Sequence, residues 1–211
     1  MTRYTPARIS LLVVGCVVLG AGVGLLLTAD LGSDGYSTLV NGISLTTGVS
    51  FVLCNTAVSA VFIALAAARR LRPDVGTLVQ ILVVGFTVSL VLDLLETPDG
   101  ITSRSAYLVV AFPVLAAGIA AYLGSNLGAG PAEAAALAWD PPVPFKWSYS
   151  CVQGGGAIVG WLLGAAIGPG TLAVVFLLGP AVDIAARAMR LDVSQERSGV
   201  TADDEGPATS R

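Results

Sequence analysis

Six polar or acidic side chains lie inside long apolar runs of this 211-residue chain: Asn55, Gln80, Ser89, Asp93, Gln153 and Asp183. An ionisable group inside hydrocarbon costs about 2.5–3.5 kcal/mol on insertion scales, so it indicates a functional site by default. Asp93 lies near the end of its run, where interfacial solvation explains it. Asp183 has Arg187 four residues later, and an ion pair is its simplest explanation. Asn55 and Gln153 are placed to bond across helices or to line a cavity.

A second candidate for chemistry is a short stretch that occurs twice. Residues 22–35 read GVGLLLTADLGSDG and residues 118–131 read GIAAYLGSNLGAGP, so an offset of 96 aligns Asp30 with Asn126 and Gly32 with Gly128. In both copies an apolar run ends in a polar residue, Leu-Gly and a break. Such a break can free backbone at membrane depth and present a half-helix N-terminus to a ligand. A surface loop followed by an interfacial helix is the open alternative.

The residues that we predict to contact a substrate come from the two breaks and from the polar positions deeper in the runs: Asp30, Gly32, Asp34, Gly35, Asn126, Gly128, Gly130, Pro131, Asn55, Gln153 and Asp183. The chain has no histidine, and its three cysteines lie in apolar runs without metal-ligand spacing. Nothing resembles a phosphate loop, a nucleophile elbow or paired catalytic carboxylates. We therefore expect no enzyme activity, catalytic residue, metal or cofactor.

The composition places these residues in a membrane protein. Hydrophobic residues make up 55% of the chain and charged residues 12%, and the mean hydropathy is +0.81. An ordinary soluble domain has about 25% charged residues. A net charge of -3 with one lysine argues against nucleic-acid binding.

The apolar runs predict an all-α, polytopic fold of about six spans, because each is near the about 20 residues that cross a bilayer. The spans are 9–29, 49–68, 77–95, 106–124, 148–167 and 171–189. The breaks between the first and second and between the fourth and fifth spans each contain a short helix, at 36–45 and 132–139. Residues 1–190 thus form a transmembrane domain, and residues 191–211 a disordered cytoplasmic tail.

The duplication extends over three spans, giving repeat one at about 9–95 and repeat two at about 106–189. Small residues recur every fourth position in the second and fifth spans: Thr56, Ala60, Ala64 and Ala68, then Gly156, Gly160, Gly164 and Gly168. Such rows let helices approach closely, so they predict the tightly packed heart of the bundle.

The basic residues predict the orientation. With the N-terminus in the cytoplasm, ten of the eleven basic residues lie inside: Arg3, Arg8, Arg69, Arg70, Arg72, Lys146, Arg187, Arg190, Arg197 and Arg211. Only Arg104 lies outside. A unit of three spans is odd, so the second copy enters the membrane from the opposite side. Inverted repeats with matching interruptions are typical of secondary transporters.

The runs LLLTADLGSDGYSTLVNGISLTTGVSFVLCN and RPDVGTLVQILVVGFTVSLVLDLL resemble the YczE/YitT-type family of bacterial integral membrane proteins. The later elements NLGAGPAEA, GWLLGAAIGPGT and LLGPAVD are similar to that family as well. The resemblance covers most of residues 15–190. It implies a multi-pass protein of the bacterial cytoplasmic membrane, with no site residues to carry over.

We therefore expect a secondary transporter of a small molecule or ion, with its site between inverted repeats. The alternative is a membrane scaffold or regulator that does not transport. Besides the bilayer and a small solute, a homo-oligomer or a membrane partner is left open. An open cavity lined by Asp183, Gln153 or the two breaks would favour transport, whereas a dry, glycine-packed interface with both breaks at the surface would favour a scaffold.

Overall fold

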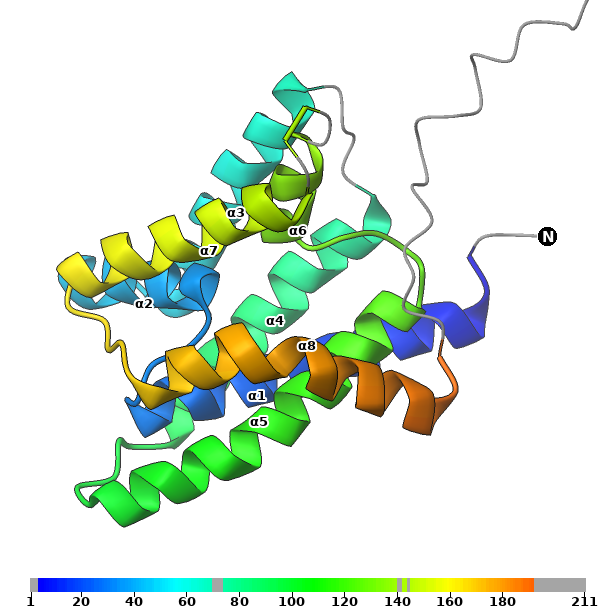
Figure 1. Cartoon of the computed structure of the whole chain (residues 1–211). Coiled ribbons are helices and arrows are strands. Elements are labelled where there is room, and N and C mark those ends of the chain that lie inside the picture. The colour runs from blue at the N-terminus through cyan, green and yellow to red at the C-terminus, as the bar shows by residue number, and fades with distance from the viewer. Residues whose placement is uncertain (1–3, 70–73, 140–141, 144, 192–211) are drawn as a thin grey trace, which may run out of the picture.

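The described part of the chain is helical. The computed structural model describes residues 4–69, 74–139, 142–143 and 145–191, so the predicted tail lies outside the described residues from 192 onward. In order along the chain, the helices are α1 (Pro6–Ala29), α2 (Gly35–Thr47), α3 (Phe51–Ala68), α4 (Val75–Leu94), α5 (Ile101–Gly124), α6 (Pro131–Leu137), α7 (Phe145–Leu162) and α8 (Pro169–Met189). Figure 1 shows α2, α3, α6 and α7 grouped on one side and α1, α5 and α8 on the other.

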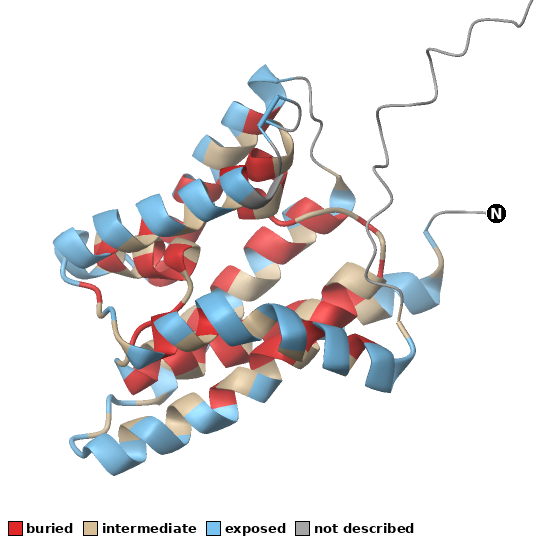
Figure 2. Cartoon of the chain, viewed as in Figure 1, coloured by how far each residue is buried: buried red, intermediate tan, exposed pale blue. Residues whose placement is uncertain are grey.

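Among the described residues, five helices are long and apolar enough to cross a membrane: α1, α3, α4, α5 and α8, with mean hydropathies of 1.8 to 2.6. Their outward faces carry exposed large apolar residues, among them Phe86, Val109 and Phe176, and Figure 2 shows these faces in pale blue. Exposure on this scale is a property of lipid-facing surface. The protein is thus a multi-pass membrane protein. The predicted fifth span, 148–167, corresponds to α7, which is not among these five in the described residues.

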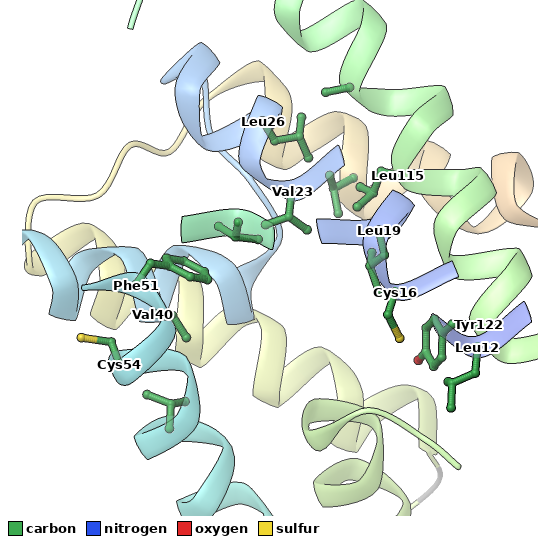
Figure 3. Packing of buried hydrophobic residues seen from close by; sticks show 14 of the residues in the cluster. Leu12, Cys16, Leu19, Val23, Leu26, Val40, Phe51, Cys54, Leu115 and Tyr122 are labelled. Carbon is green, nitrogen blue, oxygen red and sulfur yellow. The ribbon is translucent and has the colours of Figure 1, made fainter. Parts of the chain in front are cut away.

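The core forms where α1 packs antiparallel along α5. A Cβ on Gly22 would come within 2.7 Å of the Leu115 backbone, and one on Gly15 within 2.6 Å of the Tyr122 amide. Small residues let two helix backbones approach this closely. Figure 3 shows Tyr122 of α5 beside Leu12 and Cys16 of α1, all of them buried. This contact ties the first half of the chain to the second.

Both breaks have the same backbone features. Asp30 (φ 51°) and Asn126 (φ 53°) adopt the left-handed conformation, which Asp and Asn tolerate better than most residues. The next residues accept backbone hydrogen bonds from distant helices: Gly170 N donates to Leu31 O at 2.8 Å, and Gly76 N donates to Leu127 O at 2.9 Å. The short helices predicted after the breaks are confirmed as α2 and α6.

Two predicted helix ends are wrong by five residues. The structure begins α5 at Ile101 rather than 106, so the polar stretch before it is shorter. It ends α7 at Leu162 rather than 167. Gly164 there has a φ of 94°, and Ala165 N donates to Gly160 O at 2.9 Å. This left-handed glycine closes the helix although the following residues are still apolar.

The small-residue rows behave differently in the two copies. Gly156 and Gly160 of α7 are buried against the backbone of α2, where added Cβ atoms would clash with Gly35 and Thr38. The prediction of tight packing is correct for these two residues. It is wrong for Thr56, Ala60, Ala64 and Ala68, which are exposed on α3. The reason is that α3 packs on its neighbours through another face, whose buried residues are Phe51, Cys54, Asn55, Val58, Ser59 and Ala66.

Candidate functional site

A cavity of about 90 Å³ lies at the centre of the molecule and is bordered by residues of all the described helices. Its polar lining consists of Asp34, Tyr36, Ser37, Asn55, Gln80, Tyr122, Glu133, Tyr149 and Gln153. A site needs roughly 10–15 Å³ on this measure for each water, and an engineered cavity of about 150 Å³ accommodates benzene. The space therefore suits several waters, an ion or a solute of a few heavy atoms.

The first carboxyl group at the cavity, Asp34, caps the N-terminus of α2. Its Oδ2 accepts a hydrogen bond from Ser37 N at 2.9 Å, and its Oδ1 accepts one from Ser33 Oγ at 3.2 Å. An aspartate at this position satisfies one of the free amides of the first turn. Both oxygens of Asp34 thus have protein partners.

The second carboxyl group, Glu133, lies in the first turn of α6. Asp34 is the N-cap residue of α2, so Glu133 is about one helical turn further along its helix than Asp34 is. The offset of 96 aligns Asp34 with Gly130 and Ser37 with Glu133. Gly130 is the N-cap of α6 and has no side chain; a Cβ there would clash with the carboxyl group of Glu133 and the amide of Gln80. Glu133 and Gln80 therefore fill the place of a capping side chain. Glu133 is half-buried because it borders the cavity.

The surroundings of Glu133 favour its neutral form. Burial raises the pKa of Glu133, and the nearby Asp34 carboxylate raises it further, whereas the hydrogen bond from its own backbone amide opposes the rise. Desolvation disfavours a charged carboxyl group, and a second negative charge acts in the same direction. The carboxyl groups of Asp34 and Glu133 therefore interact electrostatically within one site.

Side-chain amides hold the tyrosines of the cavity in place. Gln153 accepts from Tyr36 N at 2.9 Å and donates to Tyr149 Oη at 2.8 Å. The Tyr36 hydroxyl lies 3.0 Å from Asn55 Oδ1 and 2.7 Å from Ser59 Oγ. Asn55 also donates to the backbone oxygen of Ile81 at 2.9 Å. Asn55 and Gln153 are therefore positioning residues that connect α2, α3, α4 and α7.

Two buried polar atoms at the cavity have no hydrogen-bond partner within the described residues: Gln80 Oε1 and the Tyr122 hydroxyl oxygen. Gln80 is 8% exposed and Tyr122 is 1% exposed. The Tyr122 hydroxyl lies near Glu133 but does not reach good hydrogen-bond geometry. Buried polar groups in native proteins are nearly always paired. These two atoms are thus available to a bound water, ion or solute.

The structure separates the predicted site residues into groups. Asp34, Asn55, Gln153 and Pro131 line the cavity. The glycines and Asn126 form the backbone contacts around it: Gly35 packs on the α7 backbone at Gln153, Gly32 on Thr171, Gly128 on Asp74 and Thr77, and Gly130 on Gln80 and Glu133. Thus four of the predicted residues meet at one site, and the four glycines make close backbone contacts instead of lining it.

Asp30 and Asp183 lie elsewhere. Asp30 pairs with Arg104 at 3.1 Å, and both side chains are partly exposed. With Gly32 it borders a small space of about 10 Å³, which suits a single water. Asp183 is exposed on α8, and the described residues show no ion pair between it and Arg187. Neither residue lines the central cavity.

The sequence analysis did not select Glu133 or Tyr149 as site residues, although both line the cavity. A signal for Glu133 was present: it is the only acidic residue in residues 107–139. It also aligns with Ser37 in the first turn of the other short helix. Gln80 was noted as a polar residue within a span but was not assigned to the site.

The comparisons with known proteins give a family. A family model described as "Family of unknown function (DUF6198)" matches residues 6–187. The chain belongs to this family. The matched segment covers α1 to α8 almost completely, so it includes both breaks and every residue of the cavity.

One relative shares most of its length with this DUF6198 chain. An uncharacterized protein of Haemophilus influenzae is 28% identical over 178 residues, which cover 82% of this chain and 81% of the relative. No solved structure matches the chain. The YczE/YitT-type resemblance stays a prediction.

Proposed function

We propose that this protein is a secondary transporter of a small solute and that the central cavity is its binding site. The observation that carries the proposal is the meeting of both interrupted segments at one polar cavity. Asp34 at the start of α2 and Glu133 at the start of α6 both border it. Transporter sites are typically formed by interrupted helices near the middle of the bilayer.

The proposal includes two inverted copies of a three-span unit in the bacterial cytoplasmic membrane, with both termini inside. Equivalent contacts support it. The last span of each half begins with a glycine amide bound to the break of the other half, in the pairs Gly76–Leu127 and Gly170–Leu31. The two left-handed residues, Asp30 and Asn126, occupy equivalent positions. The bias of basic residues supports the orientation.

The alternative, a scaffold that does not transport, fits the contact between α1 and α5, which is packed tightly through Gly15, Gly22 and Gly118. It does not account for the polar lining of the cavity or for its unpartnered oxygen atoms. No catalytic step is part of the proposal.

Cysteine accessibility tests transport without knowledge of the solute. Cys16, Cys54 and Cys151 are replaced, and Ser37→Cys, which borders the cavity, is introduced. We expect membrane-impermeant thiol reagents to label this cysteine in both right-side-out and inside-out vesicles, because a transporter opens its site to each side in turn.

Two control variants calibrate the labelling. Asp99→Cys, in the exposed connection between α4 and α5, should react from one side only, and Ala60→Cys, on the exposed face of α3, should not react because lipid covers it. Labelling of Ser37→Cys from a single side, or from neither, would contradict the proposal and support the scaffold.

A further inference from the structure

We propose that the central cavity binds a small monovalent cation, with Glu133 as its charged ligand and Gln80 and Tyr122 as neutral oxygen ligands. This inference rests on the proposed function only in taking the cavity as the solute site. It concerns the chemistry of what is bound there, whether that is the transported solute or a coupling ion.

The charged residues of the cavity determine the sign of the charge that a bound ligand should carry. Asp34 and Glu133 are acidic, the described residues that line the cavity include no lysine or arginine, and the chain has no histidine. The arginines nearest to these segments in sequence are engaged elsewhere: Arg104 pairs with Asp30, and Arg69 stacks on Trp139 at 4.4 Å. Helix N-termini attract anions, but here a carboxyl group already occupies each of them and repels a second anion.

Glu133 is the carboxyl group available to a ligand. Both oxygens of Asp34 accept protein hydrogen bonds, so Asp34 is committed to the cap of α2. The described residues offer Glu133 only its own backbone amide and the poorly oriented Tyr122 hydroxyl. A cation beside Glu133 would supply the missing counter-charge and hold the carboxyl group ionised.

The unpartnered atoms are independent of the acidic pair and point to the same ligand. Gln80 Oε1 and the Tyr122 hydroxyl oxygen are buried, border the cavity and lack partners in the described part of the chain. Carbonyl, hydroxyl and carboxylate oxygens are the ligands that hard cations prefer. Gln80 and Glu133 both lie beside Gly130, which leaves room for both because it has no side chain.

The number of free carboxyl groups limits the charge of the cation. Sites for Ca²⁺ combine several carboxylates with other oxygens, and Mg²⁺ retains waters beside one or two carboxylates. The described residues contain no group of three or more His, Cys, Asp or Glu side chains. One committed and one free carboxyl group match a single positive charge, and about 90 Å³ suits an alkali cation with waters or a methylammonium-sized ion.

Thermal unfolding of the purified full-length protein in detergent tests this inference. Sodium, potassium and methylammonium chloride are compared with N-methylglucamine chloride at constant ionic strength, and the arms distinguish an alkali cation from an ammonium-type ion. We expect at least one of the three to raise the Tm of the wild type in a saturable way. Glu133→Gln should raise its half-saturating concentration by about tenfold or more, and Tyr122→Phe by about threefold or more.

Matched variants keep the result interpretable. Glu96→Gln removes an exposed carboxyl group outside the cavity and should leave the response unchanged. If Glu133→Gln does not fold, Tyr122→Phe, which retains the buried ring, decides the question. The proposal is overturned if none of the three cations stabilises the wild type above N-methylglucamine, or if the purified variants respond like the wild type.

The result of the cation-binding test is independent of the result of the cysteine-labelling test of transport. Cation binding by a protein whose Ser37→Cys variant reacts from one side only would support the site and contradict transport. Two-sided labelling without a cation response would support transport and contradict the cation.

Discussion

Asp34 and Glu133 show how two copies of one unit can place the same chemical group differently. In the first copy the carboxyl group belongs to the N-cap residue and binds the first-turn amide of Ser37. In the second copy the N-cap is Gly130, and the carboxyl group reaches the cap position from Glu133, one turn along the helix. One carboxyl group is therefore fixed by the fold, and the other borders the cavity with fewer partners.

The titration of Glu133 gives a prediction with a defined sign. Because burial raises its pKa in the folded state, the folded protein binds the proton more tightly than the unfolded chain does. Below its ordinary pKa the Glu133 carboxyl group is protonated in both states, so it does not change the free energy of unfolding. As the pH rises through the folded pKa, the group lowers that free energy. In N-methylglucamine buffer, the Tm of the wild type should fall relative to that of Glu133→Gln as the pH is raised from about 4 into the neutral range.

The groups that face Glu133 are Asp34, Tyr122 from α5 and Tyr149 from α7. Both tyrosines remain protonated across this range, so their charge does not change. A Tm difference between wild type and variant that is constant with pH would contradict the prediction. A cation that binds Glu133 should restore the wild-type Tm more at the high end of the range than at the low end.

At the residue scale, sequence reasoning found the site only in part. Asp34, Asn55, Gln153 and Pro131 were predicted and line the cavity. Asp30, the acidic residue of the most recognisable motif, lies in an exposed pair with Arg104 instead. Motif similarity located the break, but the direction of each side chain depends on a left-handed backbone turn that the residue types do not specify.

The existence of the helices was predicted well because it depends on hydrophobicity alone. The helix ends and buried faces were predicted poorly because they depend on local packing. The predicted spans all correspond to helices, and both short helices occur after the breaks. The end of α7 at Leu162 depends on the conformation of Gly164. Burial of the small-residue rows depends on which face of α3 and of α7 packs on a neighbouring helix, and the period of four residues does not encode this.

The packing of α7 on α2 predicts a sharp difference between two glycines of one helix. Gly160→Leu should lower stability by about 1–3 kcal/mol or more, because its side chain would clash with the α2 backbone at Thr38. Gly155→Leu should be tolerated or slightly stabilising, because a Cβ there meets nothing within 4 Å and leucine is the better helix former. Yield and Tm in detergent measure both variants. Wild-type behaviour of Gly160→Leu would refute the close contact.

At the scale of the whole molecule, the two halves complete each other. The contact between α1 and α5 and the two backbone hydrogen bonds, Gly76–Leu127 and Gly170–Leu31, all cross from one half to the other. The inversion that the basic residues predict gives these contacts a simple rationale, since each half closes the break of its counterpart.

A split protein tests this dependence. Residues 1–99 and 100–211, divided in the exposed connection before α5, should co-purify when expressed together, and neither should be stable when expressed alone. Gly118→Leu should abolish co-purification because it clashes with the backbone of Leu19, whereas Gly179→Leu, which meets nothing within 4 Å, should not. A stable isolated half would contradict the prediction.

The backbone hydrogen bond between Gly170 and Leu31 also affects the order in which the structure can be completed during synthesis. The chain is synthesised from its N-terminus, so Leu31 enters the membrane long before Gly170 leaves the ribosome. The carbonyl group of the first break therefore lacks its backbone partner throughout most of synthesis, whereas Leu127 finds Gly76 already made. The last helix to be produced completes the first break, and truncation anywhere before α8 leaves that break open.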